Sequence, residues 1–307
     1  MKIGFIEPHV KYGIGGIRRI IEVSNRLISF GHSVTIFTPE GKPCTWIENN
    51  IPTKSLDTIK NYSFDVSVFN LSDQYKIALQ TNAKRRVFWV LAPEALYKNP
   101  KVPLESINQN FHFVVNSSYT KHYLTSHRKV KLAQKDIHII PAGINPQHFK
   151  LNSSIAKECD VLYFGSNRPW KGTAFVESAL LGMKGIRIVK MFGKNAPQSE
   201  MHKLYNKSHL YVSAAMHEGF SMTQLEAMAC GCAVITTDDG GSRDYVRNGY
   251  NAIVIKRAHF DLRSAILRLL ANTKWRSGLV CNGVKTAADS KFNWDNVAKQ
   301  FEKAISD

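Results

Sequence analysis

Glu218 and Glu226 stand eight positions apart in a stretch whose residue types could bind an anion. Gly219 follows the first glutamate and would let a ligand approach the backbone closely. Ser221 is predicted to cap a helix that carries Glu226 and ends at Gly231. The start of a helix presents free N–H groups and about half a positive charge, which suits an anion. Taken alone, either glutamate is equally well explained as a solvated carboxylate at a helix start.

A second loop adds cations to this chemistry. Lys171 and Gly172 precede a helix predicted from Thr173, after a buried strand over 160–165. A cation at a helix N-terminus is disfavoured unless an anion is bound there, so Lys171 predicts a bound anion. Arg168 could bond two phosphate oxygens at once through its planar guanidinium.

The N-terminal region predicts one strand–helix–strand unit. Apolar strands over 3–6 and 34–38 flank a glycine loop, 13–16, and a helix over 17–28. A dinucleotide-binding loop would need a third glycine at position 18, which is Arg18, so that assignment is weak. The loop is then either a ligand-binding turn or a tight turn that needs glycine for its backbone angles.

Composition indicates a globular chain of two domains. The 307 residues are 44% hydrophobic and 21% charged, and no apolar run approaches the ~18 residues of a membrane span. An acidic residue at position 7 comes too early for the apolar region of a signal peptide. The five cysteines are odd in number and lack zinc-ligand spacing, which favours buried thiols in a reducing, cytosolic setting.

The formal net charge of +17 is unusual and predicts an anionic partner. Basic residues cluster at 84–86 and 128–131. A nucleotide diphosphate, an anionic lipid surface or nucleic acid would each fit such a field. No nucleic-acid-binding motif accompanies the charge, so nucleic acid is the least favoured of the three.

Residues 218–226 resemble the E-x7-E motif of retaining glycosyltransferases of the GT-B fold, the glycosyltransferase family 4 (glycosyl transferases group 1) type. The segment 166–172 resembles the family's G-R-L-x-P-x-K-G loop, and 15–34 resembles its GG-x-x-R to G-H-x-V signature. Residues 141–145 resemble the segment that precedes its interdomain linker.

This resemblance implies an α/β chain with two Rossmann-like, doubly wound domains and an active site in the cleft between them. The expected boundaries are an N-terminal acceptor-side domain over 1–152 and a nucleotide-sugar-binding domain over 153–290. A C-terminal helix over 291–307 is expected to cross back onto the N-terminal domain.

The resemblance also assigns roles to residues of this sequence. Glu218 would orient the donor sugar, and Lys171 with Arg168 would neutralise the departing diphosphate. Ser166 occupies the usual arginine position, so Arg168 is our hypothesis for its substitute. Further donor-binding residues would be Glu226 at the ribose, the backbone of Gly219, Phe220 and Ser221, the loop glycines Gly15 and Gly16, Ser166, and Gly193 at the base.

The acceptor side departs from the family pattern. Family members often carry a histidine after the strand predicted at 87–91, whereas this chain offers Glu94 there. His9, after the first strand, is the other candidate, although a single histidine is more often structural.

The implied activity is retaining transfer of a sugar from a nucleotide-diphosphate sugar to a glycan, lipid or glycoconjugate acceptor. UDP-sugar is favoured as the donor and GDP-sugar is next. No metal is expected, since no D-x-D signature is present. A cytoplasmic protein, at the inner face of a membrane where its acceptor is lipid-linked, would fit. The alternatives are a sugar-nucleotide epimerase or a phosphorylase on the same fold, and then a nucleic-acid-binding protein.

Overall fold

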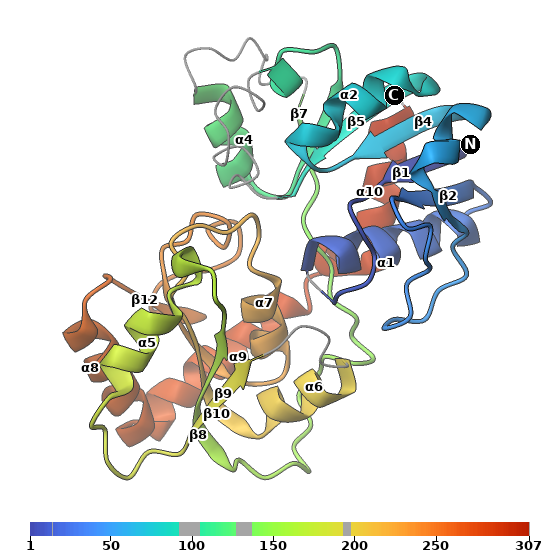
Figure 1. Cartoon of the computed structure of the whole chain (residues 1–307). Coiled ribbons are helices and arrows are strands. Elements are labelled where there is room, and N and C mark those ends of the chain that lie inside the picture. The colour runs from blue at the N-terminus through green and yellow to red at the C-terminus, as the bar shows by residue number, and fades with distance from the viewer. Residues whose placement is uncertain (14, 92–104, 127–136, 193–197, 307) are drawn as a thin grey trace. The chain divides into compact units, whose positions relative to one another are not determined.

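The computed structural model describes residues 1–13, 15–91, 105–126, 137–192 and 198–306. The chain forms two compact units, each an α/β domain with its own sheet (Figure 1). The N-terminal unit comprises Met1–Gly143 and Trp294–Asp307, and the C-terminal unit comprises Ile144–Asn293. The boundaries expected from the sequence were 152/153 and 290/291.

The N-terminal unit contains a seven-stranded sheet in the order β3-β2-β1-β4-β5-β6-β7, in which every described pair is parallel. Its strands are β1 (Lys2–Ile6), β2 (Ser33–Thr38), β3 (Thr53–Ser55), β4 (Ser63–Phe69), β5 (Asn82–Val90), β6 (His112–Val115) and β7 (Ile137–Ile139). Its helices are α1 (Gly15–Ser29), α2 (Tyr75–Gln80), α4 (Ser118–Ser126) and α10 (Trp294–Ser306), with 3-10 turns η1 (Leu56–Asn61) and η2 (Ser72–Gln74). The predicted β1–α1–β2 unit is confirmed.

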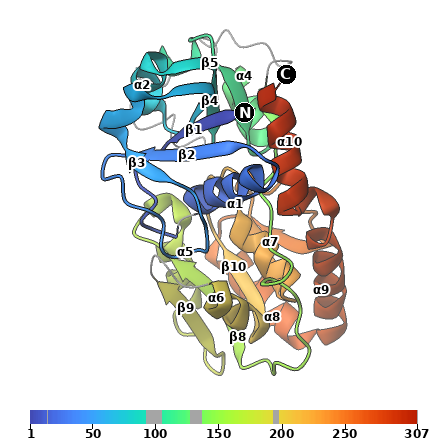
Figure 2. The same cartoon turned by 90° about the vertical axis from the view of Figure 1, so that its right-hand side faces the viewer.

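The final helix, α10, packs within the N-terminal unit beside α1 (Figure 2). The ring of Phe301 lies 4.3 Å from that of Trp89 in β5 and 6.2 Å from that of Phe5 in β1. These three rings are fully buried, so their contact removes a large apolar area from water. The last residues of the chain therefore complete the core built by the first.

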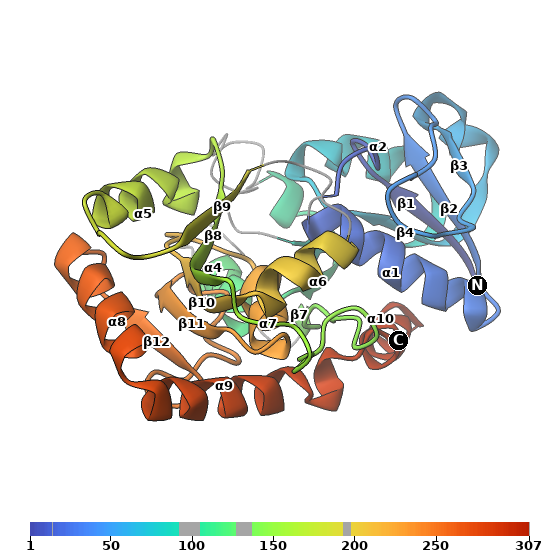
Figure 3. The same cartoon turned by 90° about the horizontal axis from the view of Figure 1, so that it is seen from below.

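The C-terminal unit contains a five-stranded parallel sheet in the order β12-β11-β10-β8-β9. Its strands are β8 (Cys159–Gly165), β9 (Ile188–Phe192), β10 (Ser208–Ser213), β11 (Ala233–Thr237) and β12 (Ala252–Ile255). Its helices are α5 (Thr173–Leu180), α6 (Gln198–Asn206), α7 (Met222–Ala229), α8 (His259–Ala271) and α9 (Thr273–Ala287), with 3-10 turns η5 (Pro169–Lys171) and η6 (Ser290–Phe292). Helices α5 and α8 pack together, as do α7 and α9 (Figure 3).

One element expected from the sequence does not form. The sequence predicts a helix with Ser242 as its N-cap, after the Gly240-Gly241 turn, and with Asn248-Gly249 at its end. The structure has a hydrogen-bonded turn there instead. The carbonyl of Ser242 accepts from the amides of Tyr245 and Val246, and regular helical bonding does not continue beyond them. The cysteine prediction is confirmed for four free, buried thiols, while Cys281 is free and exposed.

The three basic residues of β5, 84–86, all form bonds to other groups of the N-terminal unit. Lys84 pairs with Asp65 at 2.8 Å, Arg85 donates to the carbonyl of Ile305, and Arg86 donates to two backbone carbonyls nearby. The guanidinium groups thus add side-chain hydrogen bonds to backbone carbonyls of the same unit. The second basic run, 128–131, lies outside the described residues.

Replacing Gly143 by alanine is expected to lower the free energy of unfolding by about 1–3 kcal/mol, because the new methyl would overpack the core. A Cβ at Gly143 would lie 2.5 Å from Trp294 Cδ2, where α10 begins. Urea unfolding would measure the loss. Gly278→Ala is the control: it lies inside α9 with no atom within 4 Å of the new methyl, so it should stabilise slightly. An unchanged urea midpoint for Gly143→Ala would contradict the expectation.

Candidate active site

The candidate site lies at the carboxyl ends of three neighbouring strands of the C-terminal unit. Lys171 follows β8, Glu218 follows β10, and Asp239 follows β11. Ligands of open parallel sheets bind outside this edge, because the loops there leave the sheet together. The sequence-based site residues of this unit therefore share the edge that the fold class predicts.

Lys171 and Glu218 form an ion pair, with Nζ 2.5 Å from Oε1. Their side chains are 29% and 18% exposed, so a ligand can still reach both groups. A phosphate group arriving at this position would place negative charge against the same ammonium and compete with Glu218 for it. Glu218 in turn would be free to accept hydrogen bonds from hydroxyl groups.

Gly172 brings the lysine loop against the glutamate loop. Its φ of +76° lies in the left-handed region, and a Cβ there would collide with the backbone carbonyl of Ala214. The carbonyl of Trp170 also accepts from the amide of Met216 at 2.8 Å. Glycine is therefore required at 172 for both its conformation and the close approach of the two loops.

Ser166 and Arg168 shape the same lysine loop. The amide of Ser166 donates to Thr173 Oγ1 at 2.8 Å, and its hydroxyl accepts from the amide of Arg168 at 3.2 Å. The Arg168 guanidinium is exposed and lies 5.7 Å from the centroid of the Trp170 ring. A stacked guanidinium keeps its N–H edge available for an anion. Its role in donor binding stays a prediction.

Ser221 occupies the N-cap position of α7, but its side chain does not cap the helix. The residue adopts φ 66° and ψ 54°, and its hydroxyl instead donates to Asp239 Oδ2 at 2.5 Å. Capping needs an extended conformation at the N-cap, which this residue does not have. The predicted position is confirmed, and the predicted capping bond is wrong.

The remaining residues of the loop form its buried base. Phe220 is buried, with its ring centroid 5.3 Å from that of Tyr245 and 5.9 Å from that of Phe292. Gly219 is buried too, and the backbone over 218–220 lies where a Cβ of Gly241 would stand. Aromatic rings and the Gly241 backbone therefore pack against the buried side of the loop. Much of the loop itself consists of backbone atoms, because two of its residues contribute little or no side chain to its surface.

Glu226 lies buried on α7, where its Oε2 accepts from the hydroxyl of Tyr205 at 3.2 Å. Its assignment to a ribose stays a prediction. Gly193 and Glu94 lie outside the described residues.

The remaining site residues that were predicted from the sequence belong to the N-terminal unit. Gly15 and Gly16 are the first two residues of α1, whereas the sequence predicted them in a loop before a helix that begins at residue 17. His9 follows β1, and its ring centroid lies 5.2 Å from that of Tyr12 in an edge-on contact. Their donor and acceptor roles stay predictions.

Asp239 is the residue of this site whose role the sequence analysis missed. It is fully buried, and burial together with the charge of Glu218 raises the pKa of Asp239 to about 6. Its Oδ1 accepts from the amide and hydroxyl of Ser242, and its Oδ2 accepts from Ser221 and Gln224. The one available signal was a carboxylate between a buried strand and the Gly240-Gly241 turn.

The N-terminal unit also holds buried polar side chains near the carboxyl edge of its sheet. Glu7 follows β1, accepts from Asn70 Nδ2 at 2.5 Å, and has its pKa raised well above the usual range by burial. Arg19 of α1 bonds Asn116 and the carbonyls of Ile140 and Pro141, and burial lowers its pKa to about 9. Arg19 occupies the arginine position of the GG-x-x-R signature, but that signature did not predict its bonds to Asn116 and to the two carbonyls.

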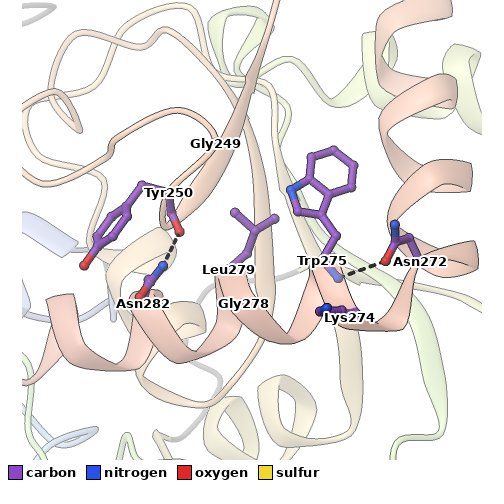
Figure 4. A pocket seen from close by; sticks show the side chains of 8 residues that line it. All are labelled: Gly249, Tyr250, Asn272, Lys274, Trp275, Gly278, Leu279 and Asn282. Carbon is purple, nitrogen blue, oxygen red and sulfur yellow. Dashed lines mark hydrogen bonds between the residues drawn. The ribbon is translucent and has the colours of Figure 1, made fainter.

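A separate cavity of about 400 Å³ lies over α9 (Figure 4). It is lined by Gly249, Tyr250, Asn272, Lys274, Trp275, Gly278, Leu279 and Asn282. Tyr250 precedes β12, so the cavity lies toward the amino ends of the strands, whereas the candidate site lies at their carboxyl ends.

Among the described residues, no three His, Cys, Asp or Glu side chains gather as a metal-ligand set. The described helices also include none with the length and apolar character needed to cross a membrane.

Residues 178–286 match the family model for glycosyl transferases group 1. This segment of the chain is therefore similar to the proteins of that family. It contains Glu218, Ser221 and Asp239, whereas Lys171 precedes it. D-inositol 3-phosphate glycosyltransferase from Frankia alni is 32% identical over 116 residues, which cover 38% of this chain and 28% of the relative. The chain spans only 26% to 30% of the length of the first curated relatives that it matches.

Solved structures show the same fold over nearly the whole chain. Sucrose-phosphate synthase from Thermosynechococcus elongatus superposes with a TM-score of 0.82 at 17% identity, covering 98% of this chain and 97% of that one. HepE from Anabaena, solved with UDP and glucose, superposes with a TM-score of 0.79 at 16% identity, covering 100% and 99%. The expected GT-B fold, with two Rossmann-like parallel-sheet domains, is confirmed.

Proposed function

We propose that this chain is a retaining glycosyltransferase that takes a nucleotide-diphosphate sugar as its donor, with UDP-sugar favoured and GDP-sugar next. The acceptor would be a glycan, a lipid or a glycoconjugate. The observation that carries the proposal is the partly exposed Lys171–Glu218 pair at the carboxyl edge of the C-terminal sheet. The glycosyl transferases group 1 match around Glu218 supports it, as does a fold neighbour solved with UDP and glucose.

The chemistry assigned to the pair follows from charge. When the bond between the sugar and the diphosphate breaks, negative charge accumulates on the departing phosphate. The Lys171 ammonium would neutralise that charge, with Arg168 at the rim of the same loop. Glu218 would accept hydrogen bonds from the donor sugar's hydroxyls and fix its orientation. No metal enters this scheme.

The acceptor and the location are less constrained. We propose a cytoplasmic protein that works at an anionic membrane face where its acceptor is lipid-linked, on the basis of the net charge of +17. Since Arg85 and Arg86 donate to backbone carbonyls within the N-terminal unit, Lys84, whose side chain is 81% exposed, and other basic residues would make that contact. Co-sedimentation with phosphatidylserine vesicles at low salt would show it, and an unbound protein there would contradict it.

Nucleotide release from a panel of UDP-, GDP- and ADP-sugars, with and without a mixed glycan and lipid acceptor fraction, tests the proposal. We expect acceptor-dependent release from one donor, insensitive to EDTA and lost in Glu218→Ala. Donor conversion without any acceptor would instead indicate an epimerase. Full activity of Glu218→Ala, or its loss in EDTA, would refute the assigned mechanism.

A further inference from the structure

Ser221 is the one non-glycine residue with a positive φ in the described part of the chain. A side chain disfavours this left-handed conformation, since its Cβ approaches the backbone, and glycine is the usual choice there. Ser221 nevertheless adopts it at the start of α7, three residues after Glu218. Interactions of the surrounding structure must therefore hold the residue in place.

Two buried groups provide those interactions. Asp239 Oδ2 accepts from the Ser221 hydroxyl at 2.5 Å, and the Tyr245 hydroxyl donates to the Ser221 carbonyl at 2.7 Å. Asp239 is fully buried and Ser221 nearly so, so water does not compete for these bonds. The side chain and the carbonyl of Ser221 are thereby both fixed.

Both carboxylate oxygens of Asp239 accept hydrogen bonds from neighbouring residues. Gln224 Nε2 donates to Oδ2 at 2.7 Å, while the amide and hydroxyl of Ser242 donate to Oδ1 at 2.9 and 2.8 Å. The Asp239 carbonyl also accepts from the Glu218 amide at 2.9 Å. One residue therefore joins the end of β11 to the glutamate, to the left-handed serine and to the first turn of α7.

We propose that Asp239 is a positioning residue for the nucleotide-sugar site: its carboxylate holds Ser221 in the left-handed conformation and so directs the amides at the start of α7 and the place of Glu218. It does not touch the donor. Because the inference rests on the proposed function, it concerns how that site is held ready and not which reaction occurs.

A purely structural role would give a different result. If Asp239 served only the fold, its loss would lower stability while the folded fraction kept its donor affinity. If Asp239 positions the loop, donor affinity falls in the folded protein. A change that removes the need for the carboxylate should then restore it. Glycine at 221 is such a change, since glycine adopts positive φ without support.

Calorimetric titration with UDP, together with steady-state kinetics on the donor that the wild type turns over, tests the inference. We expect Asp239→Asn to weaken UDP binding and raise the donor KM by about 10- to 100-fold, the usual effect of losing a bond to a charged group. Asp238→Asn is the matched control. That neighbouring carboxylate is half exposed, pairs with Arg243 at the surface and accepts a longer bond from the Gly240 amide, so less than about threefold change is expected.

Variants of Ser221 make the test independent of the folding of Asp239→Asn. Ser221→Ala loses the hydroxyl while keeping the unfavourable Cβ, so UDP binding should weaken. Ser221→Gly should weaken UDP binding less than Ser221→Ala does, and Ser221→Gly/Asp239→Asn should recover most of the affinity that Asp239→Asn loses.

The outcomes separate the two proposals. Normal UDP binding by Asp239→Asn, or a double variant as weak as Asp239→Asn, would overturn the role of Asp239. A wild-type protein that binds no nucleotide and turns over no sugar nucleotide would overturn the proposed function, and the role of Asp239 with it.

Discussion

Replacing Lys171 by alanine is expected to slow sugar transfer by about 100- to 1000-fold, the usual effect of removing one preorganised charge stabiliser. The ammonium lies 2.5 Å from Glu218 on a loop that Gly172 fixes against the end of β10. The ammonium would thus already be in place when charge develops on the departing phosphate of the proposed donor. Its loss should lower kcat more than donor affinity, because that charge is greatest in the transition state.

Lys190 supplies the matched control for this prediction. Lys190 lies on β9 and also pairs with a glutamate, Glu177, at 2.5 Å. The exposed fractions are 38% for the Lys190 side chain and 43% for the Glu177 side chain. Exposed pairs contribute about 0–1 kcal/mol, so Lys190→Ala should transfer sugar at nearly the wild-type rate. Initial-rate kinetics at saturating donor would measure both. Equal losses in the two variants, or none in Lys171→Ala, would remove Lys171 from the mechanism.

The loops of the site were predictable where local rules decide them. Gly231 ends α7 with φ +76°, as a glycine after a helix is expected to do. Gly172, beside Lys171, has φ +76°, a conformation that favours glycine over other residues. The apolar run over 160–165 predicted β8, since a strand buried on both faces reads as a continuous apolar segment.

The links between those loops were not predictable, because they depend on strand register. Ser221 and Asp239 are 18 residues apart and meet only because β10 and β11 pair in parallel. A serine before an apolar helix looks like a cap in any sequence window. What overrides that local preference is a buried carboxylate supplied by the next strand of the sheet.

Long-range bonds also changed the interpretation of charge. Arg85 donates to the carbonyl of Ile305, 220 residues away, so a basic run that suggests a binding surface is partly structural. Arg19 similarly bonds backbone carbonyls over 120 residues away. Charge counts in a sequence do not distinguish a cation that faces solvent from one that satisfies a buried carbonyl.

The free energy of unfolding is expected to fall as pH rises, because Asp239 holds its proton more tightly in the folded than in the unfolded chain. Its folded pKa is about 6, against 3.8 ordinarily. Between these values the folded state binds more protons, so raising the pH favours unfolding. The full difference is about 3 kcal/mol, of which about half falls between pH 5 and pH 8.

Urea unfolding at pH 5 and pH 8, in the wild type and in Asp239→Asn, would measure this contribution. Glu7 acts in the same direction, since burial also raises its pKa, so the wild-type slope alone does not isolate Asp239. Asparagine does not titrate, so the variant should lose about 1.5 kcal/mol less between the two pH values. Equal losses in the two proteins would mean that Asp239 is ionised throughout this range.

This pH dependence bears on the proposed positioning role of Asp239, because it shows what the ionised carboxylate costs in stability. An ionised Asp239 beside Glu218 lowers stability, yet only the carboxylate can accept all four of its hydrogen bonds. The chain therefore gives up stability near neutral pH to keep Ser221 in place, as expected where a site is held in an unfavourable conformation. Asp239→Asn should accordingly lose less stability than the wild type between pH 5 and pH 8 while binding UDP less well. A variant that is less stable and yet binds normally would show the opposite: a carboxylate that serves the fold alone.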